Sequence, residues 1–226
     1  MKASKKLERA HALELAASEP VHDNGVSRMV QLLLDVGIDG VGPLKSAREI
    51  ADDAVRQSRS ADAAVAKVAR SHVAKGAAGG FVTSVGGFVT MPVALPANVA
   101  EFYLLATRMV ASIAHLRGYD IDEPRVRTAI LLTLVGSDAD EVLAKAGLAS
   151  GGGKMVHLVS GQLPPAGLLI LNKAIAFRLL RGVGEKAFSK LGRGVPLLGG
   201  LVGGGIDTWM MKRIADHAMG EFPPLI

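Results

Sequence analysis

The chain contains no cysteine, and only 4% of its 226 residues are aromatic. Without thiols it can form neither a disulfide framework nor a cysteine zinc site, and it has no thiolate nucleophile. The scarcity of aromatic side chains also removes the base-stacking platforms on which single-stranded nucleic acid is bound. We therefore exclude these classes of enzyme and binding protein, and we expect no nucleic-acid partner.

Charge is also missing, over one long stretch. Between Lys75 and Glu101 lie 25 consecutive residues without an ionisable side chain. A helix of that length could cross a bilayer, but the stretch contains five glycines and two prolines, which interrupt a straight span. We predict a helical hairpin that is hidden from water, either by the rest of the protein or by a membrane.

Helical periodicity dominates the sequence, and no segment shows the alternation of a β-strand. The sequence predicts an all-α fold: a single domain over 1–226, built as a two-layer helical bundle around glycine-rich apolar hairpins, with 149–154 as an alternative internal boundary. In three of the predicted helices a single residue marks the start: Pro43, Pro96 and Asp122. The predicted helices cover 3–17, 27–36, 43–57, 60–75, 96–117, 122–136, 137–146, 166–181, 184–192 and 196–222.

A second glycine-rich segment, 195–206, resembles the first. In both, small residues lie four positions apart and lead into an amphipathic helix with an acidic residue near its start, Glu101 or Asp207. We interpret this as an internal repeat whose glycines and prolines act as structural hinges. The hinge residues are Gly86, Gly87, Pro92, Pro96, Gly199 and Gly203.

The net charge of +5 comes from one region. Residues 173–193 hold six basic side chains against Glu185 alone, and the basic residues alternate with apolar ones. Such an amphipathic helix suits an anionic membrane surface, although an ordinary solvated helix face would show the same pattern. The basic residues are Lys173, Arg178, Arg181, Lys186, Lys190 and Arg193.

Three polar residues, Glu101, Arg108 and His115, recur every seven positions and so share one face of helix 96–117. If this face turns inward, desolvation requires partners, and Asp207 is the expected partner of Arg108. Such a polar seam would hold helices in register or bind a lipid head group. The alternatives are a solvated polar stripe and, at lower weight, a hydrolase that uses Glu101, His115 and Asp207.

No motif assigns a reaction. The glycines before Lys154 lack the spacing of a phosphate loop, and the six histidines lack the spacing of metal ligands. We expect no metal and no cofactor, and we assign no catalytic residue. Glu8 and Glu14 interrupt any apolar core of a secretory signal, so the expected location is the cytoplasm.

Two segments, taken in their order along the chain, resemble a known family. The run GFVTSVGGFVTMPVALPANVAEFYLLATRMVASIAHLRGYD, 80–120, has a glycine-rich turn before a proline-started helix, and 195–222 closes the chain with a P-x-x-G-x-x-x-G helix. With helix 124–136, these segments resemble the bacterial EcsC family. The matching positions are Gly86, Gly87, Pro92, Pro96, Arg108, Gly118, Tyr119, Asp120, Pro196, Gly199 and Gly203.

The resemblance implies a helical protein with a membrane or ABC-transporter connection, and it transfers no catalytic residue. The chain departs from the family at Asn98, where an acidic residue is common, with Glu101 three positions later. From residues and resemblance together we expect a non-enzymatic protein that is peripheral to the inner face of the cytoplasmic membrane. Its expected partners are an anionic lipid surface and an ABC transporter, and self-association stays open. The alternative is a soluble helical protein that binds a lipid or another apolar ligand.

Overall fold

The fold is all-α, as predicted: the described residues form helices and no strand. The computed structural model describes residues 33–42, 44–85, 91–136 and 196–225, and single positions at 139, 171, 172, 174, 175, 178 and 179; for 77–85, 91–100, 196–204 and 206 it describes the backbone alone. The elements are a π-helical turn, η1 (Leu33–Ile38), and the α-helices α3 (Ala47–Arg56), α4 (Ala61–Val85), α5 (Met91–Leu116), α6 (Pro124–Val135) and α10 (Pro196–Glu221).

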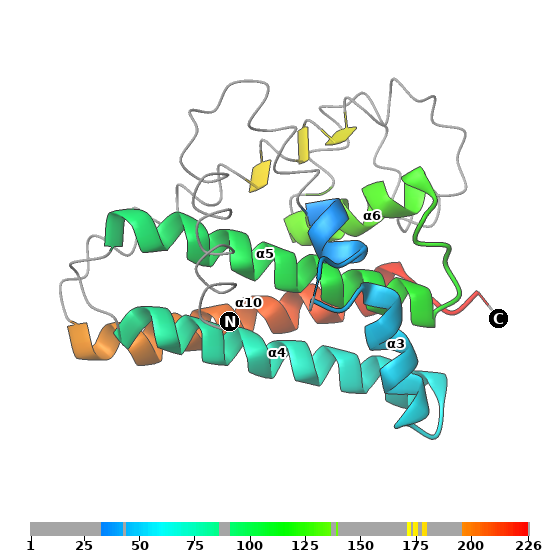
Figure 1. Cartoon of the computed structure of the whole chain (residues 1–226), viewed down its shortest axis with the longest axis horizontal. Helices are drawn as coiled ribbons and strands as arrows, with labels where there is room; N and C mark the ends of the chain where they lie inside the picture. Colours follow the sequence, from blue (N-terminus) through cyan, green and yellow to red (C-terminus); the bar gives the residue numbers. More distant parts are fainter. Residues whose placement is uncertain are drawn as a thin grey trace.

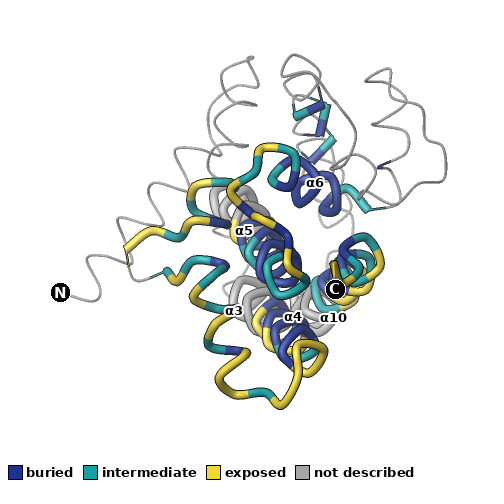
Figure 2. Tube along the Cα trace, turned by 90° about the vertical axis from the view of Figure 1, so that its right-hand side faces the viewer, coloured by how far each residue is buried: buried dark blue, intermediate teal, exposed yellow. Residues whose placement is uncertain are grey.

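Three long helices set the shape of the described part. α4 has 25 residues, and α5 and α10 have 26 each. α4 runs antiparallel to both others, and α5 lies between α6 on one side and the pair α4 and α10 on the other (Figures 1 and 2). The shorter elements η1 and α3 pack against α5 as well. α5 is therefore the element around which the described residues are arranged.

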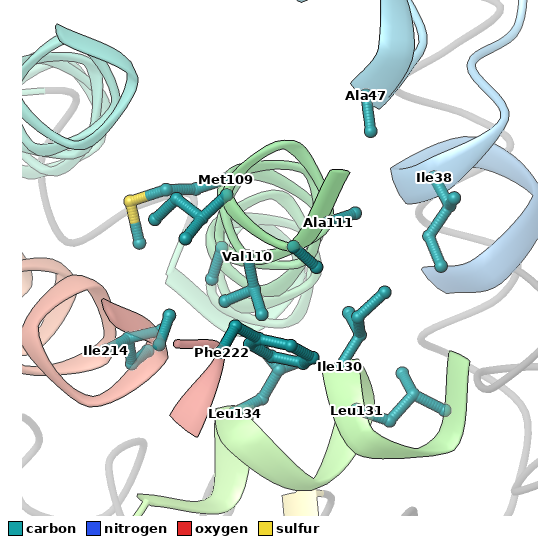
Figure 3. Packing of buried hydrophobic residues seen from close by; sticks show 14 of the residues in the cluster. Ile38, Ala47, Met109, Val110, Ala111, Ile130, Leu131, Leu134, Ile214 and Phe222 are labelled. Carbon is teal, nitrogen blue, oxygen red and sulfur yellow. The ribbon is translucent and has the colours of Figure 1, made fainter. Parts of the chain in front are cut away.

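The hydrophobic core surrounds the C-terminal half of α5. Val110 is fully buried and points toward Phe222 at the end of α10 and toward Ile130 and Leu134 of α6 (Figure 3). Full burial of a side chain of this size stabilises a fold by about 1.5–3 kcal/mol. The residues that form this core come from every described helix, so the packing joins them into one unit.

The start of α3 differs from the sequence prediction. Its helix begins at Ala47, not in a turn containing Pro43, because Ser46 caps it. The Ser46 hydroxyl accepts a hydrogen bond from the Glu49 amide at 3.2 Å, and the Glu49 carboxylate accepts one from the Ser46 amide at 2.8 Å. This reciprocal pair is a capping box. At the next helix, the predicted cap Ser60 is confirmed, since its hydroxyl accepts from the Ala63 amide at 3.2 Å.

The predicted end of α4 is wrong, because the helix continues through Gly76 to Val85. A glycine ends a helix when it adopts a left-handed conformation, and Gly76 does not. Inside a helix it costs only about 0.5–1 kcal/mol relative to alanine. The hinges Gly199 and Gly203 likewise lie within the continuous helix α10.

The predicted start of α5 at Pro96 is also wrong, since the helix begins at Met91. Pro92 lies in the first turn, where a backbone N–H would have no intrahelical acceptor in any case. Pro96 lies further inside and removes one helical hydrogen bond. The predicted end of this helix is confirmed at Gly118, which has a φ of 93°.

α6 starts at Pro124 with Glu123 in the N-cap position, so Asp122 is not the cap. The Asp122 carboxylate instead accepts a hydrogen bond from Arg48 of α3 at 2.5 Å, and this bond lowers its pKa. The predicted end of the helix at Gly136 is confirmed, with a φ of 64°.

Arg127 of α6 extends this polar cluster. Its guanidinium makes two hydrogen bonds to Asp39, at 3.0 and 2.6 Å, and a third to the Ile121 carbonyl at 3.0 Å. Asp122 lies 3.4 Å from the same guanidinium. The cluster therefore connects the turn after η1 with α6 and, through Asp122, with α3.

At one end the three long helices are fastened together around Arg117, which follows α5. Its carbonyl accepts a hydrogen bond from the Leu225 amide at 3.1 Å, and its guanidinium donates to Asp62 in the first turn of α4 at 2.7 Å. Beside it, Tyr119 meets Phe222 edge to face, with ring centroids 5.2 Å apart. We call this the Arg117 end.

Several predictions fall outside the described residues. They include the helices at 3–17 and 184–192, the boundary at 149–154, and the hinges Gly86 and Gly87. The division of the bundle into two layers also stays a prediction.

Candidate functional site

The ends of the long helices that lie away from Arg117 carry no charge. They are residues 76–85 of α4, 91–100 of α5 and 196–206 of α10, which together contain no Asp, Glu, Lys, Arg or His. Because α4 runs opposite to its neighbours, these three segments lie together at the left of Figure 1. We call them the uncharged end. The sequence reveals each segment but not that the third joins the other two in space.

Charged residues begin at a similar distance from the tip in all three helices. Lys75 precedes the last ten residues of α4, Glu101 follows the first ten of α5, and Asp207 follows the first eleven of α10. At 1.5 Å per residue, each uncharged segment is about 15 Å long. Lys75 and Glu101 are exposed, and Asp207 is half-buried. Within the three helices the uncharged segments are thus of similar length, and Lys75, Glu101 and Asp207 are the first charged residues that follow them toward the Arg117 end.

One exposed ridge of α10 extends from its uncharged segment into its charged part. Gly205, Trp209 and Arg213 are spaced by four residues and are all exposed, so they lie one above the other on the helix. Trp209 is 57% exposed, and the Arg213 guanidinium carbon lies 4.8 Å from the centroid of its ring. The neighbouring Lys212 is paired with Asp216 at 2.6 Å. An exposed tryptophan at the edge of an uncharged region is the main feature that sequence reasoning missed.

At Gly76 and Met211, α4 and α10 approach closely. A Cβ atom added to Gly76 would meet Met211, with the nearest atom at 3.4 Å. Small residues permit such an approach between helices in water or in lipid. Gly76 therefore contributes close packing inside α4 rather than a helix end.

The four residues of the predicted polar seam are in different surroundings. Arg108 is half-buried, and its guanidinium donates to the Val36 carbonyl in η1 at 3.0 Å. Desolvation lowers the pKa of Arg108, and its Nε has no hydrogen-bond partner among the described residues. Glu101 is exposed, while His115 and Asp207 are half-buried. Arg108 thus connects α5 to η1.

His72 of α4 is a buried polar residue. It is 0% exposed, and its Nδ1 lies 2.9 Å from the Val68 carbonyl one turn earlier. Burial lowers the pKa of His72 to about 4, with smaller contributions from the positive charges of Lys75 and Arg108. Because Nδ1 donates to a carbonyl, Nε2 is the unprotonated nitrogen, and within the part of the chain that the structure describes it has no hydrogen-bond partner. The ring is therefore neutral at physiological pH.

The basic segment 173–193 lies almost wholly outside the described residues. Of its six cations only Arg178 is described, and that residue is half-buried. Burial raises the pKa of Tyr103 on α5 to about 12, and the charge of Arg178 partly offsets this rise. The membrane-surface role predicted for Lys173, Arg181, Lys186, Lys190 and Arg193 stays a prediction.

The geometry offers little for catalysis. Glu101 and His115 are fourteen residues apart on one continuous helix, which places them about 21 Å apart along its axis. A small substrate could not contact both. Within the described residues, no group of three His, Asp or Glu side chains is arranged to hold a metal ion.

No helix in the described ranges combines the length and the apolar character needed to cross a membrane. Comparison of the chain with known protein families, with curated proteins and with solved structures gives no match. The resemblance to the EcsC family therefore stays a prediction.

Proposed function

We propose that this protein attaches to a membrane by inserting its uncharged end into one leaflet. The observation that carries the proposal is that three uncharged helix ends, each about 15 Å long, lie on the same side of the molecule. The hydrocarbon core of a bilayer is about 30 Å thick, so this depth matches a single leaflet. Charged residues would begin where the head groups begin.

Within the inserted segments, the backbone groups beyond the terminal turn are hydrogen-bonded inside the helix, as lipid requires, whereas those of the terminal turn need partners outside it. The Arg117 end and the core around Val110 would stay outside the membrane, where their ion pairs remain in contact with water. The attachment is non-enzymatic. An association with an ABC transporter has only the EcsC resemblance in its support, and we include it as a secondary part of the proposal.

Gly205 and Gly220 make a matched pair of sites for a test. Both are exposed on α10, and an added Cβ atom meets nothing within 4 Å at either. Gly205 lies in the uncharged end, whereas Gly220 lies near the Arg117 end. Substitution by aspartate at either site should leave the fold intact, which circular dichroism and thermal melts in the absence of vesicles would verify.

The experiment is flotation with vesicles of phosphatidylcholine and phosphatidylglycerol. We expect the wild-type protein and Gly220→Asp to float, and Gly205→Asp to bind about tenfold more weakly, because a charge is costly inside the hydrocarbon region. Binding should persist in about 1 M salt, where electrostatic attraction is screened beyond about 3 Å. A wild-type protein that does not float, or a Gly205→Asp variant that floats equally well, would contradict insertion.

The same experiment addresses the alternative of a bound apolar ligand. A ligand-binding protein would stay at the bottom of the gradient and would carry a copurified lipid in native mass spectrometry, whatever the salt concentration.

A further inference from the structure

The exposed ridge of α10 supports a more specific inference, which rests on the proposed function. We infer that Trp209 lies in the head-group layer of the membrane and that Arg213 binds the phosphodiester of a lipid there, so that the pair sets the depth of insertion.

Distances along α10 place these residues. Measured from Pro196, the start of the helix, Gly205 lies at about 13 Å, Trp209 at about 20 Å and Arg213 at about 25 Å. Half of a bilayer extends about 15 Å through the hydrocarbon and about 20–22 Å when the head groups are included. If the tip reaches the middle of the bilayer, Gly205 is within the hydrocarbon and Trp209 is at head-group depth.

The chemistry of the indole suits that depth. Tryptophan is enriched at membrane interfaces because its ring is largely apolar while its N–H needs a polar partner. The ring of Trp209 is 57% exposed, although burying a side chain of this size is favourable. In the head-group layer the ring would lose contact with water and keep a partner for its N–H.

The guanidinium of Arg213 is available for a phosphate. Among the described residues no hydrogen bond or ion pair engages it, and its guanidinium carbon lies 4.8 Å from the centroid of the Trp209 ring. Side chains of a helix lean toward its N-terminus, so Arg213 reaches back toward the uncharged end. Its planar fork of N–H donors matches phosphate oxygens. Lys212 is less suited, since its ammonium is paired with Asp216.

Because Trp209 is the only tryptophan of the chain, its fluorescence reports this site alone. The test uses phosphatidylcholine–phosphatidylglycerol vesicles whose acyl chains carry bromine either near the glycerol or near the methyl end. We expect a blue shift of the emission on binding and stronger quenching by the shallow bromines than by the deep ones. Stronger quenching by the deep bromines, or an unshifted and unquenched emission, would overturn the inference.

The lipid contact is tested with Arg213→Gln, and Arg59→Gln serves as the control. Arg59 is exposed and lies between α3 and α4, away from the uncharged end. Loss of one cation at an anionic surface should weaken binding by about fivefold in Arg213→Gln and leave Arg59→Gln unchanged. Equal affinities of the two variants would overturn the role of Arg213.

Two further measurements distinguish a failure of this inference from a failure of the proposed function. Inorganic phosphate at millimolar concentration should neither shift the emission of Trp209 nor compete with vesicles; competition would assign the site to a free anion and overturn the lipid contact. A protein that floats while Trp209 stays exposed to water refutes the depth assignment and leaves the proposed function standing. A protein that does not float refutes both.

Discussion

Gly37 of η1 lies directly against Thr107 of α5. A Cβ atom added at Gly37 would come within 2.9 Å of both Cβ and Cγ2 of Thr107, closer than real Cβ contacts occur. Thr107 cannot turn away easily, because it is fully buried and its hydroxyl donates to the Tyr103 carbonyl at 2.7 Å. The absence of a side chain at Gly37 is therefore what allows η1 to pack on α5.

The first prediction concerns this contact. Gly37→Ala should lower the free energy of unfolding by about 1–3 kcal/mol, since overpacking forces the backbone to shift. Urea unfolding would measure the change, with Gly205→Ala as the control because its added methyl group has open space. Adding Thr107→Ala should restore stability only in part, because the Thr107 Cβ atom also lies at 2.9 Å. An unchanged midpoint in Gly37→Ala would show that η1 and α5 are not in close contact.

The second prediction concerns Gly76, where the opposite sign is expected. Gly76→Ala should raise the free energy of unfolding by about 0.5 kcal/mol, because alanine favours a helix and its Cβ would meet Met211 at an ordinary distance of 3.4 Å. Gly76→Leu should instead destabilise the protein, whereas Gly205→Leu should not. Thermal melts of the wild-type protein and of these three variants would test this; tolerance of leucine at Gly76 would mean that α4 and α10 are further apart.

The third prediction is a pH dependence due to His72. Its pKa falls from 6.5 to about 4 on folding, first because of burial. The unfolded chain therefore binds a proton more readily, so the stabilising effect is present above pH 6.5 and is lost as the pH falls toward 4. For these pKa values the free energy of unfolding should drop by about 2 kcal/mol between pH 7 and pH 5.

Urea titrations at both pH values, on the wild-type protein and on His72→Gln, would isolate this contribution. In His72→Gln the free energy of unfolding should change much less between the two pH values than it does in the wild-type protein, whatever the absolute stability of the variant. An equal pH dependence of the free energy of unfolding in both proteins would mean that His72 is accessible to solvent in the folded protein.

The fourth prediction concerns Arg127 and Asp39. Their paired hydrogen bonds are charge-assisted and bidentate, but both side chains are partly exposed, so solvent screens them. A double-mutant cycle with Arg127→Met and Asp39→Asn should give a coupling energy of about 1 kcal/mol. The exposed pair Lys212 and Asp216, four residues apart on α10, should give no more than about 0.5 kcal/mol. A smaller coupling for Arg127 than for Lys212 would contradict the connecting role of Arg127.

The sequence predicted those helix ends that depend on one turn of local structure. Ser60 accepts a hydrogen bond from an amide three residues later, Gly118 and Gly136 adopt positive φ, and Pro196 needs no amide partner at the start of α10. Each of these signals acts within a few residues, so it can be recognised without knowledge of the fold.

The wrong end of α4 and the wrong start of α5 came from treating glycine and proline as breakers wherever they occur. Gly76 stays helical and fits against Met211, from a segment far along the chain. Pro92 falls within a first turn whose position depends on how far α5 extends. Such outcomes depend on packing between distant segments, which a local pattern does not contain.

The same limit applies to the candidate site. The uncharged stretch after Lys75 is visible in the sequence. That it lies beside residues 196–206 in space depends on the antiparallel arrangement of α4 and α10. The contact of Arg108 with the Val36 carbonyl is equally non-local. Trp209 could have been singled out from the sequence as a candidate site residue, because this only tryptophan follows an uncharged half-helix and precedes Arg213 by four residues.

The contacts at the Arg117 end also bear on how the length of the three long helices could change during evolution. They hold the three long helices in register at one end, and Val110 lies in the half of α5 that is nearer to this end. Adding or removing a turn beyond Gly76, with matching changes in α5 and α10, would alter how far the molecule reaches without disturbing these contacts. Under the proposed insertion into a membrane, the length of the helices is thus a variable that evolution, or a designer, could adjust to suit membranes of different thickness.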